Sequence, residues 1–195
     1  MVGFTRLEWA VHSNVEDEAA GAAQKSQAPV YSVDLHPDGS RFATAGGDCR
    51  VKVWSTAALP RGKAAKAALP AGHQHLLCSK GAHLGPINCL RWSPDGRYLA
   101  TASDDKTIKV WELHAGSGSV FGGDFCIENW KDIRTLRGHS LNVMGVCWSP
   151  DGKMLASCSL DNTLAVWQVE DMAQPRLLHQ LQGHRGLVKG LAWDP

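Results

Sequence analysis

The sequence has few of the features that would assign it to a simple functional class. It has no run of about 18 apolar residues, so no transmembrane helix is expected. Its start lacks the basic and apolar regions of a secretory signal. The net charge is only +1, so no global field draws it to nucleic acid or to an anionic membrane. An intracellular location is the expectation that follows.

The six cysteines are at least eleven residues apart, so no Cys-x-x-Cys pair indicates zinc binding or redox work. Most of them lie in apolar stretches that suit strands. We therefore expect reduced, buried thiols that act as small hydrophobic side chains. No metal, cofactor or small-molecule substrate is expected.

What the sequence does contain is an internal repeat. Trp-Ser-Pro-Asp-Gly occurs at 92–96 and again at 148–152, and His-Pro-Asp-Gly occurs at 36–39. In each copy, ten residues separate the Asp of this motif from a second Asp, and six more lead to a Trp. The three sets are Asp38, Asp48 and Trp54; Asp95, Asp105 and Trp111; and Asp151, Asp161 and Trp167. A fixed internal spacing decides the architecture before any single residue is interpreted.

Each repeat reads as four short strands separated by turns, because apolar runs of strand length alternate with Pro-Asp-Gly and other Asp-centred turns. Four antiparallel strands in about 40 to 50 residues make one blade of a β-propeller. We predict an all-β chain that forms a partial β-propeller of three four-stranded antiparallel blades plus the first strand of a fourth. The expected parts are an N-terminal strand and variable loop at 1–29, blade 1 at 30–82, blade 2 at 83–138, blade 3 at 139–183 and the start of blade 4 at 184–195.

Three segments interrupt the repeat: 13–28, 55–75 and 114–130. All three are expected to be surface loops, the first two mobile. The second carries Arg61, Lys63 and Lys66, but three spaced charges offer only weak attraction to nucleic acid, so direct nucleic-acid binding is not expected.

Hydroxyl, imidazole and carboxylate side chains recur in every repeat and suggest a catalytic triad at first sight. A triad occurs once in an enzyme, however, whereas this set returns at constant spacing. A chain of hydrogen bonds from indole to hydroxyl to imidazole to carboxylate, which satisfies polar groups inside each blade, accounts for the recurrence. The members are Thr44, Asp48 and Trp54; His83, Thr101, Asp105 and Trp111; and His139, Ser157, Asp161 and Trp167, with His184 opening the next set.

These residues resemble the WD-repeat family. Gly138-His139 and Gly183-His184 match its Gly-His signature, whereas His83 follows Ala82, and Trp54, Trp111 and Trp167 are not followed by Asp. In the first repeat the expected His position is Ser26. Either this blade lacks its His, or His12 fills the role with 13–28 looped out.

A closer resemblance is to the HIRA family of histone-chaperone subunits. It is carried by Trp9–His12, by Tyr31–Gly39 with Phe42–Gly47, by Val120–Gly122 with Glu128–Trp130, and by Gly183–Pro195. This resemblance implies a non-enzymatic scaffold in the nucleus that docks a ubinuclein-type subunit, acts indirectly on core histones and supports replication-independent chromatin assembly and transcriptional regulation.

A generic WD-repeat adaptor is the alternative: a ubiquitin-ligase substrate receptor or a signalling scaffold. Such receptors usually carry Trp-Asp-x-Arg after the third strand, and no repeat here supplies that Arg. An enzyme is the least favoured class, because no catalytic cluster stands outside the repeat.

Partner contacts are expected in loops beside the structural residues, at Leu84, Asp104, Asn142, Leu160 and Arg185. Trp130, an aromatic in the 114–130 insert, is a further candidate, although anchoring of its own loop is the favoured role. A seven-bladed ring needs roughly 300 residues, so we expect blade faces left uncovered by this chain.

Overall fold

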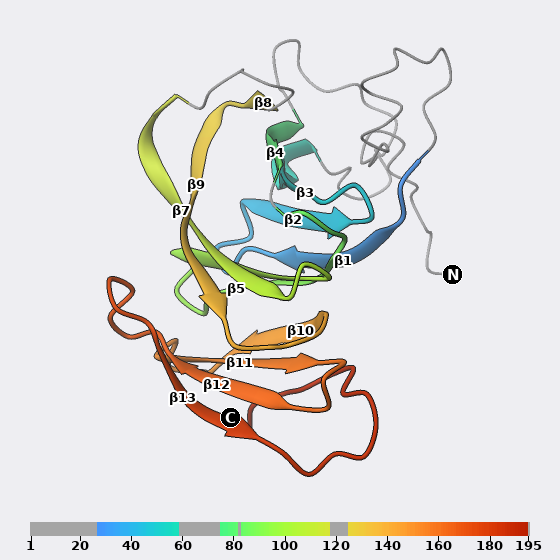
Figure 1. Cartoon of the computed structure of the whole chain (residues 1–195). Coiled ribbons are helices and arrows are strands. Elements are labelled where there is room, and N and C mark those ends of the chain that lie inside the picture. Colours follow the sequence, from blue (N-terminus) through green and yellow to red (C-terminus); the bar gives the residue numbers. More distant parts are fainter. Residues whose placement is uncertain (1–26, 59–74, 82, 118–124, 195) are drawn as a thin grey trace, which may run out of the picture.

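A computed structural model describes residues 27–58, 75–81, 83–117 and 125–194. Within these ranges the chain is all-β apart from the 3-10 turn η1, Thr56–Ala58. The strands form three separate antiparallel sheets that follow one another along the chain, as the blades of a partial propeller do (Figure 1). In the described part of the chain, no helix is long and apolar enough to span a membrane.

The three blades have closely similar strands. Blade 1 contains β1 (Val30–Leu35), β2 (Arg41–Gly46), β3 (Arg50–Ser55) and β4 (Leu76–Gly81), with β8 (Phe125–Cys126) added at its edge. Blade 2 contains β5 (Ile87–Trp92), β6 (Tyr98–Ser103), β7 (Thr107–Ser117) and β9 (Glu128–Arg137). Blade 3 contains β10 (Val143–Trp148), β11 (Met154–Ser159), β12 (Leu164–Gln168) and β13 (Arg176–Leu181).

The Pro-Asp-Gly motifs form the turns between the first and second strands of each blade. Gly39, Gly96 and Gly152 have φ angles of 72°, 73° and 70°, in the left-handed region that glycine adopts without cost. The preceding Asp accepts a hydrogen bond from the backbone two residues on, as when the Ser40 N–H donates to Asp38 at 2.7 Å. The repeated motif is therefore a repeated turn.

The apolar core lies between the blades. One cluster joins blades 1 and 2 and includes Val53, Leu90 and Trp111; the other joins blades 2 and 3 and includes Val110 and Leu155. Each of these five side chains is at most 2% exposed. A blade thus buries its faces against its neighbours and not within itself, as expected for a repeat architecture.

A tryptophan at the end of each first strand ties one blade to the preceding one. The Trp92 indole N–H donates to the Asp34 carbonyl at 3.3 Å, and that of Trp148 donates to the Arg91 carbonyl at 3.0 Å. Trp193 repeats the contact on the Cys147 carbonyl at 3.2 Å. The segment 187–193 therefore lies beside β10, where a fourth blade begins. It does not form the β-strand that was predicted there, because no second strand within the described residues pairs with it.

The predicted loop at 114–130 is wrong at both of its ends. β7 continues to Ser117 and β9 begins at Glu128, so the insert extends a hairpin that pairs Leu113 with Trp130. Between these strands, β8 crosses to blade 1 and pairs with β4. Blade 1 consequently has five strands instead of the predicted four, the fifth of which comes from the second repeat; residues 118–124 lie outside the described ranges.

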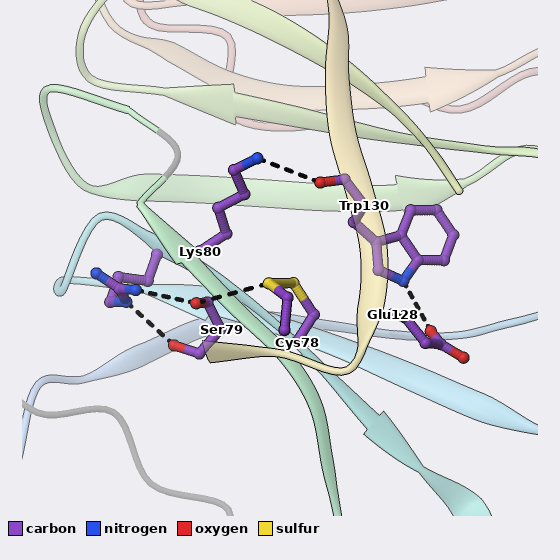
Figure 2. The surroundings of a disulfide bond; sticks show 7 residues. Cys78, Ser79, Lys80, Glu128 and Trp130 are labelled. Carbon is purple, nitrogen blue, oxygen red and sulfur yellow. Dashed lines mark hydrogen bonds between the residues drawn. A yellow bond between two sulfur atoms is a disulfide. The ribbon is translucent and has the colours of Figure 1, made fainter. Parts of the chain in front are cut away.

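The expectation of six reduced thiols is also wrong for one pair. Cys78 on β4 and Cys126 on β8 face each other across the strands and are joined by a disulfide (Figure 2). A sequence separation of 48 residues gave no sign of this pair, because it depends on where β8 docks. Cys49, Cys89, Cys147 and Cys158 are free thiols, two of them buried and two half-buried.

The inter-blade tryptophans carry a measurable share of the stability. Trp148 is 8% exposed, and its ring stacks on Tyr98 with centroids 6.2 Å apart. Trp148→Ala should lower the free energy of unfolding by about 3 to 5 kcal/mol, since it leaves a cavity between blades 2 and 3. Urea denaturation measures this, with Leu84→Ala as control, because Leu84 is 99% exposed and should change stability by less than about 0.5 kcal/mol.

The disulfide can be tested on the oxidised protein. Peptide mapping without reduction should recover a cross-linked pair that contains Cys78 and Cys126, while the four other cysteines are alkylated as free thiols. Cys126→Ala should lower the free energy of unfolding by about 2 to 4 kcal/mol under oxidising conditions, because the cross-link restricts the unfolded chain. Equal stability of the two proteins would contradict a formed disulfide.

Candidate functional site

In blade 2, four polar side chains form a continuous hydrogen-bonded chain. The Trp111 indole N–H donates to the Thr101 hydroxyl at 3.0 Å, and that hydroxyl lies 2.8 Å from Nε2 of His83. Nδ1 of the same imidazole is 2.8 Å from the Asp105 carboxylate. Because a carboxylate only accepts, Nδ1 carries a proton, and in the neutral imidazole Nε2 then accepts from the hydroxyl. The chain links the third strand to the loop that enters the blade.

Blade 3 repeats this arrangement with serine in place of threonine. The Trp167 indole N–H donates to the Ser157 hydroxyl at 3.1 Å, which lies 2.8 Å from Nε2 of His139. The Asp161 carboxylate is 3.0 Å from Nδ1 of His139. It also accepts the Ser140 backbone N–H at 2.9 Å, so it fixes the loop as well as the imidazole.

In blade 1 the carboxylate forms an ion pair with a lysine. The Trp54 indole N–H donates to the Thr44 hydroxyl at 2.8 Å, as in the other blades. The Asp48 carboxylate forms an ion pair with Lys52 at 3.2 Å, and both side chains are at most 8% exposed. His12 and Ser26, the two residues considered for the histidine position of this blade, lie outside the described residues.

Hydrogen bonds set the ionisation of the two imidazole-bound carboxylates. Burial favours a higher pKa of Asp161, but the Thr163 hydroxyl and the backbone N–H groups of Ser140 and Thr163 outweigh it and lower the pKa to about 2. At Asp105, burial again opposes the shift, and bonds from His83, Thr107 and the Leu84 N–H hold the pKa well below its ordinary range. Both groups are therefore charged at neutral pH.

The hydroxyl groups at the centre of these two chains are enclosed. The Thr101 and Ser157 side chains belong to residues that are 0% exposed, and each hydroxyl is engaged by an indole on one side and an imidazole on the other. A nucleophile needs an approach for its substrate, which neither hydroxyl has. No group of three metal-ligating side chains with a suitable arrangement occurs in the portions of the chain that the structure describes.

The predicted partner contacts occupy different environments. Leu84 is 99% exposed, and His184 and Arg185 are exposed too. Asp104, Asn142 and Leu160 are half-buried; Asp104 accepts from the Asn88 amide at 2.7 Å, and the Leu160 N–H donates to the Asn142 carbonyl at 3.0 Å. Leu84 and Arg185 are thus the two of this set that point most openly to solvent.

Trp130 is buried instead of presented to a partner. It is 4% exposed, and its ring meets that of Trp92 edge to face with centroids 5.2 Å apart. Its indole N–H donates to Glu128 at 2.8 Å, and its carbonyl accepts from Lys80 at 3.3 Å (Figure 2). These contacts favour the anchoring role: Trp130 holds the insert against blade 1.

Two further exposed leucines were missed in the sequence. Leu141 is 45% exposed and Leu187 is 56% exposed, and both lie, like Leu84, in the loop that follows the histidine of a repeat. An apolar residue two or three positions after that histidine was the available signal. Together, Leu84, Leu141 and Leu187 put an exposed aliphatic side chain into the entry loops of three successive repeats, which we call the loop leucines.

A comparison with known families identifies the propeller to which these blades belong. Residues 21–195 match the CAF1B/HIR1 beta-propeller domain. The chain belongs to this family. Since the match extends through all three blades, the HIRA-like propeller expected from the sequence is confirmed.

Individual relatives carry HIRA-type names. The chain is 39% identical to "Protein HIR1" of Cryptococcus neoformans over 98% of its own length and 20% of that protein. It is 43% identical to "Protein HIRA" of Dictyostelium discoideum over 71% of its length and 12% of that protein. The "Protein HIRA homolog" of Drosophila melanogaster is 44% identical over 72% of the chain and 14% of the relative. The chain thus spans a fifth or less of these relatives.

The low pKa of Asp161 makes a prediction about stability and pH. A carboxyl group with a folded-state pKa below its unfolded value stabilises the fold above the unfolded value and loses that contribution as pH falls through the folded one. Asp161→Asn should therefore lower the free energy of unfolding by about 1.5 to 3 kcal/mol at pH 7. The difference from wild type should shrink between about pH 4 and pH 2.

Urea denaturation at several pH values measures this difference. Asp194→Asn is the matched control, because Asp194 is exposed and, among the described residues, belongs to no such hydrogen-bonded chain. Its effect should stay within about 0.5 kcal/mol at every pH. A difference between wild type and Asp161→Asn that is the same at pH 7 and pH 2 would contradict the low pKa.

Proposed function

We propose that this chain forms part of a non-enzymatic protein-interaction scaffold in a HIRA-like histone chaperone. The proposed setting is the nucleus, where the whole protein takes part in replication-independent chromatin assembly and in transcriptional regulation. The observation that carries this proposal is the family match over residues 21–195. The relatives named HIRA and HIR1, at 39 to 44% identity, support it.

The geometry supports a scaffold rather than a catalyst. The side chains that resemble a catalytic set are engaged in holding each blade together, and they position the loops that follow the histidines. Rigid strands with variable loops at one end suit the binding of partner proteins. The loop leucines and Arg185 are the proposed contact positions, beside the half-buried Asp104, Asn142 and Leu160.

The proposed partners are a ubinuclein-type subunit, bound directly, and core histones, bound through the assembled complex. Direct binding to nucleic acid is not part of the proposal, since the net charge of +1 supplies no basic field. A generic WD-repeat adaptor is the second candidate. It shares the scaffold and differs in its partners.

Affinity purification of the natural full-length product tests this proposal. We expect a ubinuclein-like subunit and core histones to be recovered together. Leu84→Asp should reduce recovery of the subunit at least about fivefold, because it puts a charge into the apolar contact. Leu113→Asp is the matched control: Leu113 is 40% exposed on β7 and does not belong to the loops, so recovery should not change.

Two results would overturn the proposal. Recovery of cullin-ligase components without histones or a ubinuclein-like subunit would favour the adaptor. Equal loss of partners with Leu84→Asp and Leu113→Asp would show that the loop leucines are not the contact. Circular dichroism and the midpoint of thermal unfolding of both variants separate loss of binding from loss of folding.

A further inference from the structure

A groove of about 380 Å³ opens on blade 2 beside its entry loop. Leu84 forms one lip, and the polar side is lined by Thr107 and Lys109 from β7 and by Thr135 and Arg137 from β9. Thr107 pairs with Arg137, and Lys109 pairs with Thr135. Since alternate residues of a strand point to the same side, these four side chains share one face of the sheet.

Arg137 is the unpaired charge of this groove. Lys109 already forms an ion pair with Asp132 at 2.8 Å. Asp105 accepts from His83, Thr107 and the Leu84 N–H, so its oxygens are occupied. Arg137 is exposed, and in the described ranges no carboxylate lies within ion-pair distance of it. A guanidinium with free donors suits a carboxylate, which it can hold with two parallel hydrogen bonds.

The repeat itself does not require this charge. In blade 1 the corresponding positions are Arg50, Lys52, Ser79 and Gly81. There the Arg50 guanidinium donates to Ser79 at 3.1 Å and 3.0 Å, and Lys52 pairs with Asp48, so both cations are turned inward and buried.

Blade 3 offers no cation at this place. Ala165 pairs with Gln180 where blade 2 pairs Lys109 with Thr135, and Gln182 follows where blade 2 has Arg137. Blade 2 therefore carries an outward, unpaired Arg on a face where its neighbours are either closed internally or neutral. A role in the fold does not explain this difference, whereas recognition of a ligand does.

We propose that the groove binds an acidic segment of a partner protein. A Glu or Asp side chain of this segment pairs with Arg137, and a neighbouring aliphatic side chain packs on Leu84, whose 99% exposure leaves its whole surface available. The inference rests on the proposed scaffold function, because its ligand is a protein. A nucleic acid is disfavoured because one unpaired cation, flanked by Asp105 and Asp132, gives little attraction to a polyanion.

Fluorescence anisotropy with the full 195-residue chain tests the groove. The probe is a fluorescein-labelled dodecapeptide of glycine and serine with one central Glu-Leu pair, and the reference is the same peptide with glutamine for glutamate. We expect the acidic peptide to bind at least about tenfold more tightly than the reference. Arg137→Gln should weaken its binding about tenfold, as one lost charged contact predicts, and Arg137→Lys should restore part of the affinity.

Arg176→Gln is the matched control, since Arg176 is an exposed arginine on the fourth strand of blade 3, away from the groove. It should leave affinity within about twofold. Leu84→Ala should weaken binding of the peptide without abolishing it.

The proposal is wrong if the two peptides bind equally, if Arg137→Gln and Arg176→Gln have the same effect, or if single-stranded DNA of equal length displaces the peptide at equal concentration. Its failure is distinct from failure of the scaffold. If an Arg137→Gln chain does not bind the acidic peptide but purification still recovers the ubinuclein-like subunit, the proposed scaffold function is retained and only the groove proposal is wrong. If the peptide binds through Arg137 while purification recovers no such subunit, only the chaperone assignment falls.

Discussion

A buried indole N–H must find an acceptor, and this requirement organises the chain. All seven tryptophans in the described ranges donate their N–H to an oxygen. Three do so within a blade, to the hydroxyl that begins the polar chain, and three do so between blades, to a carbonyl of the preceding first strand. The seventh, Trp130, donates to the Glu128 carboxylate. An unsatisfied donor in such a place would cost roughly 1 to 3 kcal/mol. The requirement for an indole hydrogen bond therefore shapes both the polar chain within each blade and the contact between neighbouring blades.

The same requirement shows why much of the fold could be read from the sequence. Trp111 and Thr101 must be ten residues apart because two short strands and one turn join them, and blade 3 keeps that spacing. The predictions that failed concern features that the repeat does not determine. The glycine-rich composition of 114–130 indicated a loop, but cross-strand pairing with β4 and the burial of Trp130 overrode it. The disulfide followed from that docking and had no local signal.

The candidate site was predictable to a similar degree. The polar chains were identifiable, since their spacing repeats, and so was the loop that carries Leu84. The groove was not, because it depends on the register that sets Arg137 beside Thr107 and on there being no carboxylate among the described residues within ion-pair distance of Arg137. In a repeat protein the side chains that recur are already engaged in the hydrogen bonds and packing that form each repeat. Recognition then falls to residues in which one repeat differs from its neighbours, and these are found by comparing blades within the same chain.

The fifth strand of blade 1 also bears on how the protein is made. β4 ends at Gly81, but the strand that covers its edge begins only at Phe125, after most of the second repeat. At a synthesis rate of about 5 to 20 residues per second, the edge of β4 leaves the ribosome roughly 2 to 9 seconds before its cover. During that interval blade 1 presents unpaired backbone groups and the thiol of Cys78 to the surrounding cell. Blade 1 is thus completed only after most of blade 2 has been synthesised, because its fifth strand lies within the second repeat.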